Sequence, residues 1–186
     1  CSRVSMVWLG SVLLPAEIHW VGWLVGISIE LIVPLIPAIA QNRLPVDNPH
    51  ITERYGIFTI IVLGESFVKI LEDGQGQVLN FDAFLFSVGG LTVVYSLWWL
   101  YFSDTAGKLV DTASERKSVT WLYGHLPLAA SLVAFGVGAK KLFAEVYAHP
   151  GDPLKDEYRL LYTTSIVMFM VALALIDYGL DDSQTA

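Results

Sequence analysis

Long apolar runs separated by short polar connections are the feature that most constrains this chain. A helix needs about 20 consecutive apolar residues to cross the roughly 30 Å hydrocarbon core of a bilayer. Runs of that length occupy residues 18–40, 51–71, 81–102, 119–146 and 158–178, and a shorter run occupies residues 4–14. The sequence therefore predicts an all-α, polytopic transmembrane helix bundle with five to six membrane-spanning helices.

The composition supports a membrane protein and excludes several other classes. The 186 residues are 54% hydrophobic and 16% charged, whereas about a quarter of the residues in a soluble domain are charged. The net charge of −7 argues against nucleic acid binding, which needs a basic surface. The single cysteine, Cys1, excludes an internal disulfide framework and a CxxC metal site.

We expect one transmembrane domain over residues 1–186 that belongs to a longer protein, because the chain begins without Met. Its predicted location is an integral, multi-pass position in the inner or plasma membrane if the source is bacterial. The expected partners are the lipid bilayer and other membrane subunits. Short connections predict that helices adjacent in the sequence run antiparallel.

The segment 50–69 places Glu65 well inside an apolar stretch. A carboxylate in hydrocarbon is costly and usually functional. Arg54 lies on the same helix face but about 16 Å away along the axis, too far to pair with it. Lys69 stands at i+4 and is able to neutralise Glu65 near an interface. Alternatively, Glu65 faces a polar cavity or proton path, which is favoured by Gly64 because glycine permits close approach of another helix.

Two further polar features lie near this segment. His50, Glu53 and Arg54 fall at i, i+3 and i+4, which favours a polar network in the first helical turn over a metal site. Glu30 lies past the middle of the 18–40 run without an opposite charge within a turn. It therefore needs a partner from another helix, or it stays protonated. It is either a hydrogen-bonded structural residue or part of a proton or cation site.

His125 stands about two turns into its apolar run, and Pro127 is expected to bend the helix beside it. It could hydrogen-bond to Glu65 or Glu30, ligate a cofactor, or have a structural role. His19 is expected near the membrane interface. The sequence shows no nucleophile–base pair, metal cluster or phosphate loop, so we predict no enzyme activity and no catalytic or metal-binding residues.

Three motifs occur together: HITERYGIFTIIVLGES from residue 50, LWWLYF from residue 97 and WLYGHLPL from residue 121. In this order and spacing they resemble the bacterial low temperature requirement protein A (LtrA) family over roughly residues 45–135. The resemblance implies a polytopic inner-membrane protein; the family name reports a growth phenotype in the cold, not a mechanism. Family members are about twice as long and begin with a further membrane half, so we expect a C-terminal half or a reduced homologue. The motif positions carried over are His50, Glu53, Arg54, Gly64, Glu65, Trp98, Trp99, Tyr123, Gly124 and His125.

Two hypotheses for function follow. The first is a proton or solute transporter- or channel-like protein with a buried polar site. The residues predicted for that site are Glu65, His125, Arg54, Glu30, Glu53, His50 and Lys69. The second is a non-catalytic accessory subunit of a larger membrane complex that contacts pigment or lipid. In that case His19 or His125 would be an axial ligand to a tetrapyrrole; no other cofactor is predicted.

Overall fold

The computed structural model describes residues 2–12, 15–33, 48–72, 81–105, 108–111, 114–149 and 152–180. These residues are almost entirely helical, which confirms the all-α prediction. The chain divides into two compact units, residues 1–46 and residues 47–186. The single transmembrane domain expected over residues 1–186 stays a prediction.

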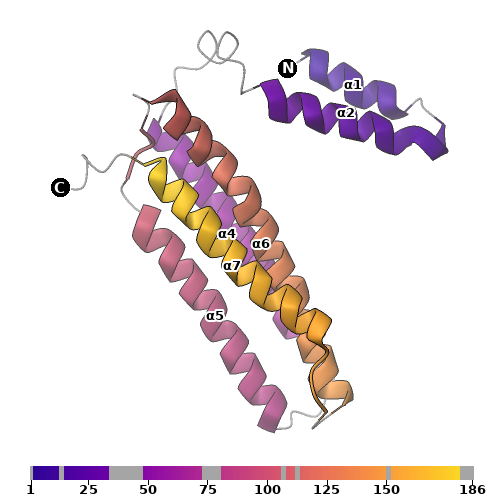
Figure 1. The fold of residues 1–186 in the computed structure, drawn as a ribbon, viewed down its shortest axis with the longest axis vertical. Coiled ribbons are helices and arrows are strands. Elements are labelled where there is room, and N and C mark those ends of the chain that lie inside the picture. Colours follow the sequence, from indigo (N-terminus) through magenta and orange to yellow (C-terminus); the bar gives the residue numbers. More distant parts are fainter. Residues whose placement is uncertain are drawn as a thin grey trace. The chain divides into compact units, whose positions relative to one another are not determined.

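The first unit contains two helices, which lie side by side in Figure 1. They are α1 (Ser2–Val12) and α2 (His19–Ile32), and the short 3₁₀ helix Ala16–Ile18 precedes α2. The part of the predicted 18–40 run that follows residue 33 lies outside the described residues. As described, α2 has 14 residues, which is shorter than a bilayer crossing requires.

A tryptophan of α1 holds this pair of helices together. A Cβ atom at Gly26 of α2 would lie only 3.2 Å from the Trp8 indole, so the glycine makes room for the ring. One turn further along α2, Glu30 accepts a hydrogen bond of 3.0 Å from Trp8 Nε1. The polar partner that Glu30 needed from another helix is therefore an indole of α1.

The second unit is a bundle of four helices that run alongside one another (Figure 1). They are α4 (Asn48–Glu72), α5 (Phe81–Thr105), α6 (Glu115–Ala148) and α7 (Asp156–Tyr178). Each helix matches one predicted run to within a few residues. α6 begins four residues before its apolar run because the Ser114 side chain caps it, accepting a bond of 3.4 Å from the Lys117 backbone N–H.

Close contacts define the direction in which each helix runs. A Cβ at Gly124 or Gly138 of α6 would meet Ile176 or Tyr162 of α7, respectively, so α6 and α7 are antiparallel. The early part of α4 lies against the early part of α6, where the Tyr55 and His125 rings are 4.4 Å apart. Further along both helices, Ser66 donates a hydrogen bond to the Leu132 carbonyl. α4 and α6 are therefore parallel neighbours.

Within the second unit, consecutive described helices run antiparallel, as expected from the short connections. Tyr101, near the end of α5, contacts His125 in the first half of α6. Phe86, near the beginning of α5, contacts Phe143 towards the end of α6. The centre of the bundle is built mainly from α6, whose Leu128, Leu132 and Phe135 are almost completely buried.

A polar clasp joins the α5–α6 connection to the end of α7. Val110 and Leu180 form an isolated antiparallel bridge, and the Asp111 backbone N–H donates to the Gly179 carbonyl at 3.0 Å. Lys108 adds an ion pair of 2.8 Å with Asp177. The glycine at position 179 is required because a Cβ there would lie 2.5 Å from Trp121 Cβ.

Three described helices are long and apolar enough to cross a membrane. They comprise residues 84–105 of α5, all of α6 and all of α7, fewer than the five to six predicted. α4 has sufficient length, with 25 residues, but it carries Glu53, Arg54 and Glu65, which lower its hydropathy. The described residues thus confirm helices capable of spanning a membrane.

Candidate functional site

His125 lies at the centre of the four-helix unit and is only 2% exposed. Its Nδ1 is 2.8 Å from the Trp121 carbonyl oxygen, and its Nε2 is 3.1 Å from the Tyr101 hydroxyl. A carbonyl oxygen only accepts hydrogen bonds, so Nδ1 carries the proton of the neutral ring. Nε2 is then the acceptor, and the Tyr101 O–H donates to it.

Aromatic rings surround this histidine. The centroids of the Tyr55 and Trp121 rings lie 4.4 Å and 4.5 Å from the imidazole centroid, and the Tyr101 ring meets it edge-on at 6.1 Å. The Trp121 Nε1 atom is buried and has no hydrogen-bond partner within the described parts of the chain. A buried donor without a partner is uncommon in a folded protein.

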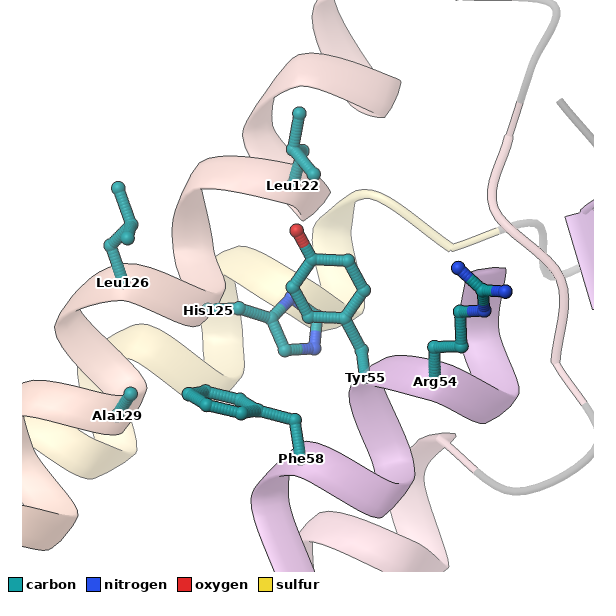
Figure 2. A pocket seen from close by; sticks show the side chains of 7 residues that line it. All are labelled: Arg54, Tyr55, Phe58, Leu122, His125, Leu126 and Ala129. Carbon is teal, nitrogen blue, oxygen red and sulfur yellow. The ribbon is translucent and has the colours of Figure 1, made fainter. Parts of the chain in front are cut away.

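Two pockets flank the His125–Tyr101 hydrogen bond. The α4–α6 pocket has a volume of about 390 Å³ and is shown in Figure 2. It is lined by Arg54, Tyr55, Phe58, Leu122, His125, Leu126 and Ala129. The α4–α5 pocket has a volume of about 400 Å³, and its polar lining includes Thr52, Glu53, Tyr101, Thr105 and Lys108. Because His125 lines one pocket and Tyr101 lines the other, a single hydrogen bond connects them.

Polar side chains on one face of α4 lie where this helix packs against α6. Tyr55, Thr59 and Ser66 are spaced by four and seven residues, so they share one helix face. Thr59 is 1% exposed and donates to the Tyr55 carbonyl at 2.9 Å. Ser66 is 2% exposed and reaches the Leu132 carbonyl of α6 at 2.9 Å. Both hydroxyls donate to backbone carbonyls, and the Thr59 side chain also interacts with Tyr101 of α5, so these residues let α4 pack closely against its neighbours.

The structure brings Arg54 to the same pocket as His125 but keeps Glu65 away from it. Glu65 is exposed, and it lies ten residues beyond Tyr55, about 15 Å further along the helix axis. It is also turned about 100° away from Ser66, the residue that faces α6. The contact predicted between Glu65 and His125 is therefore not formed, and Tyr101 takes the place of the carboxylate.

The close helix approach predicted at Gly64 is not found either. No described atom lies within 4 Å of a Cβ built at Gly64. The close approach between α4 and α6 occurs at Gly136, where a Cβ would lie 3.0 Å from the Ser66 Cα. The Glu65–Lys69 pair stays a prediction, because the Lys69 side chain lies outside what the structure describes.

The remaining predicted residues occupy other places. His50 and Glu53 are exposed in the first turns of α4, and Glu53 lines the α4–α5 pocket. Glu30 and the half-buried His19 belong to the first unit. Whether Glu30 joins the polar site, and whether His19 binds a pigment, stay predictions.

The comparisons with known proteins agree with the motifs. The family described as "Bacterial low temperature requirement A protein (LtrA)" matches residues 1–185. The chain belongs to the LtrA family. The match extends well beyond the motif region, residues 45–135, and includes both structural units.

One curated relative of this LtrA-family chain is "Uncharacterized protein RA0937" of Rhizobium meliloti (strain 1021). It is 30% identical over 160 residues, which cover 77% of this chain and 38% of the relative. The chain thus spans well under half the length of that relative. No solved structure matches the chain.

Sequence reasoning missed three residues of the site in this LtrA protein. Tyr55, Tyr101 and Trp121 were not among the predicted site residues. All three lie inside the motifs that revealed the family. Tyr55 and Trp121 stand within one helical turn of Arg54 and His125, which is a signal that could have found them, whereas Tyr101 reaches His125 from another helix.

Proposed function

We propose that this LtrA-family protein is a multi-pass membrane protein, with five to six spanning helices, that moves protons or a small polar solute through its four-helix unit. The observation that carries the proposal is the buried hydrogen bond from Tyr101 to His125, which connects two separate pockets. A buried histidine in an apolar bundle is costly to charge, and such residues commonly belong to ion or proton paths.

The geometry suggests how a proton would pass. A proton arriving from the α4–α5 pocket adds to the Tyr101 oxygen while the original hydroxyl proton moves to His125 Nε2. Tyr101 ends as a neutral phenol and His125 as an imidazolium, so one positive charge has moved from the pocket to the ring. Release towards the α4–α6 pocket requires the Nδ1–H group to break its hydrogen bond with the Trp121 carbonyl and to give its proton to a solvent acceptor in that pocket. The ring is then neutral with its proton on Nε2, and it must turn over to restore the starting tautomer. Arg54 lines the same pocket, and its like charge disfavours the imidazolium.

Proton flux in liposomes tests this role. We expect His125→Gln to lower the flux of the reconstituted protein about a hundredfold or more, in the range typical for loss of a general acid–base group. Tyr101→Phe should lower it similarly, because the phenol oxygen is needed to receive the incoming proton. His149→Gln is the control, since His149 is 53% exposed beyond the end of α6. Unchanged flux in His125→Gln would disprove the proposed path.

Glu65→Gln separates this path from the one that the sequence alone favoured. Because Glu65 is exposed and far from His125 along the helix, we expect its neutralisation to leave proton flux nearly unchanged. If Glu65→Gln stops the flux while His125→Gln does not, the titrating group is Glu65, and the path follows the outer face of α4.

The second candidate function is an accessory subunit of a larger membrane complex. It is supported by an exposed aromatic ladder on α5, in which Tyr95, Trp98 and Trp99 contact one another in sequence and are 38% to 59% exposed. Such a face fits a partner helix, a pigment or lipid. Purification in mild detergent tests it. Co-purifying subunits or visible absorbance support this role, and a colourless, solitary protein contradicts it.

A pigment needs an axial ligand, and His19 and His125 are the two predicted candidates. Both His125 nitrogens are already hydrogen-bonded, so axial ligation there would require breaking one of these bonds. Loss of visible absorbance in His19→Ala or in His125→Ala would identify which histidine ligates the tetrapyrrole.

A further inference from the structure

The α4–α6 pocket has two chemically different ends. In Figure 2 the Tyr55 and His125 rings, which are tilted by 47° to each other, occupy its middle, with Arg54 on one side and the aliphatic side chains of α6 on the other. The lining away from Arg54 is formed by Phe58, Leu122, Leu126 and Ala129, all apolar. A ligand that fills this pocket must therefore combine a polar end with an apolar end.

Arg54 is the charged end and is exposed. Among the described residues its guanidinium has no hydrogen bond or ion pair. The contrast with Arg159 is direct, because Arg159 of α7 pairs with Asp156 at 3.1 Å. Guanidinium groups at the membrane level usually pair with an anion or reach the interface. Arg54 thus presents a fork of N–H donors suited to a carboxylate or phosphate.

The His125 ring in the middle of the pocket does not bind that anion, because both of its nitrogens are already hydrogen-bonded. Nδ1 of His125 donates to the Trp121 carbonyl, and Nε2 accepts from Tyr101. The ring therefore has no donor left for an anionic group, and the Tyr55 ring covers it at 4.4 Å. Arg54 is the only positively charged side chain in the lining of this pocket, and the Tyr55 O–H group is the other side-chain donor there.

The mouth of the pocket is apolar. Phe58 is 47% exposed and Leu126 is 52% exposed, and α6 is one of the helices long and apolar enough to cross the membrane. A ligand reaching the pocket along this face would come from the bilayer. The pocket has a volume of about 390 Å³, which is within the usual range for a small-molecule site.

We propose that the α4–α6 pocket binds an anionic amphiphile. A single carboxylate or phosphate head pairs with the Arg54 guanidinium, and the hydrocarbon chain lies along Phe58, Leu126 and Ala129. This binding site goes beyond proton or solute movement, because it holds whether or not a proton passes through His125. The α4–α5 pocket is not an equivalent site, because its lining contains both Glu53 and Lys108.

Native mass spectrometry of the purified protein in detergent tests the contact between Arg54 and the anionic head group. The probes are dioleoyl phosphatidylglycerol, oleic acid, and dioleoyl phosphatidylcholine, which has a head with no net charge. We expect at least one anionic probe to bind about tenfold more tightly than phosphatidylcholine, as a charge-assisted hydrogen bond predicts. Which anionic probe binds more tightly distinguishes a phospholipid from a free fatty acid.

Substitutions of Arg54 decide whether the preference arises at this residue. Arg54→Gln should remove the preference for the anionic probe, and Arg54→Lys should retain part of it, because lysine keeps the charge but loses the planar fork. Arg159→Gln is the matched control, since it removes the same charge from an exposed position on α7. A full anionic preference in Arg54→Gln would overturn the proposal.

The contact between the pocket and the hydrocarbon chain of the amphiphile is tested separately. Ala129→Leu adds bulk to the apolar part of the pocket, so it should weaken binding of the anionic probe severalfold without removing the preference for charge. Inorganic phosphate, which has no chain, should not displace the bound amphiphile at equal concentration. Unaltered binding in Ala129→Leu, or ready displacement by phosphate, would show that the hydrocarbon chain is not bound in the pocket.

Discussion

α5 and α6 have the same hydropathy and very different surroundings. The most apolar window of each has a mean hydropathy of 1.4, yet 50% of that window is buried in α6 and only 22% in α5. Hydropathy therefore identifies helices that suit a bilayer but does not show which one forms the centre of the bundle. The candidate site lies on the helix that is more deeply buried, at the point where α5 reaches it.

Glycine placement explains much of this difference. Gly124, Gly136 and Gly138 of α6 each lie where an added Cβ would approach a neighbouring helix to 3.2 Å or less. Gly89 of α5 has no atom within 4 Å of its Cβ position. Small residues allow helices to approach closely in membranes, so α6 packs tightly against α4 and α7 while α5 remains at the side.

The largest effect should come from adding bulk to α6. Gly136→Leu places a side chain against the Ser66 backbone, and we expect it to destabilise the protein by about 3 kcal/mol, at the upper end for overpacking. Gly89→Leu on α5 should be neutral or slightly stabilising, because leucine is the better helix former. Unfolding by SDS in mixed micelles measures both. Equal destabilisation would show that α5 packs as tightly as α6.

Two buried tyrosines provide the next comparison. Tyr101→Phe removes the donor to His125 Nε2, so it should destabilise the protein by about 1–2 kcal/mol, the cost of an unsatisfied buried acceptor. The buried Tyr147 hydroxyl of α6 has no hydrogen-bond partner among the described residues. Tyr147→Phe should therefore be neutral or stabilising. The same micelle titration would refute this distinction if both variants lost stability equally.

Much of the helical fold could be predicted from the sequence because a membrane helix requires a continuous apolar run. The run 81–102 became Phe81–Thr105, and the run 158–178 became Asp156–Tyr178. The extra residues at their ends are polar, such as Thr105, whose hydroxyl is satisfied by the Tyr101 carbonyl. Hydropathy cannot register such local hydrogen bonds.

The candidate site was predicted only in part. His125 and Arg54 were both predicted for one polar site, and they line the same pocket; that this pocket is a proton site stays a prediction. Glu65 or Glu30 was offered as the hydrogen-bond partner of His125, and the partner is Tyr101. The reason is that the rotation of one helix against another depends on packing at Ser66 and Gly136, which no pattern within a single helix contains.

A smaller effect is expected at the clasp that holds α5 near the end of α7. Lys108→Gln breaks the ion pair with Asp177, whose carboxylate is half exposed, so the loss should be about 0.5 kcal/mol, as for other exposed pairs. Arg159→Gln, which breaks a fully exposed pair on α7, should cost still less. If Lys108→Gln lost more stability than Tyr101→Phe, the clasp, rather than the contact between Tyr101 and His125, would be what holds α5 against α6.

The smallest effect concerns the far end of α6. A hydrogen bond and the charge of Glu145 raise the pKa of Lys155 above its usual value. A raised pKa means that this contribution to stability is complete below the pKa of an unfolded lysine, about 10.4. It is lost as the pH rises through the folded value.

The melting temperatures of wild type and Lys155→Gln should therefore differ slightly up to about pH 10 and converge at higher pH. Lys141→Gln, on the exposed side of α6, should show no such convergence. A difference between wild type and Lys155→Gln that grows with rising pH would contradict the assignment of this ion pair.

For the proposed multi-pass protein, the parallel arrangement of α4 and α6 has a consequence for the order of synthesis. α4 carries Arg54 and Glu65 and is less suited to enter lipid unaided than the three helices that follow it. Its neighbour α6 is synthesised only after α5 is complete. Under this proposal, newly made α4 lacks the helix that covers its packing face until α6 has been synthesised.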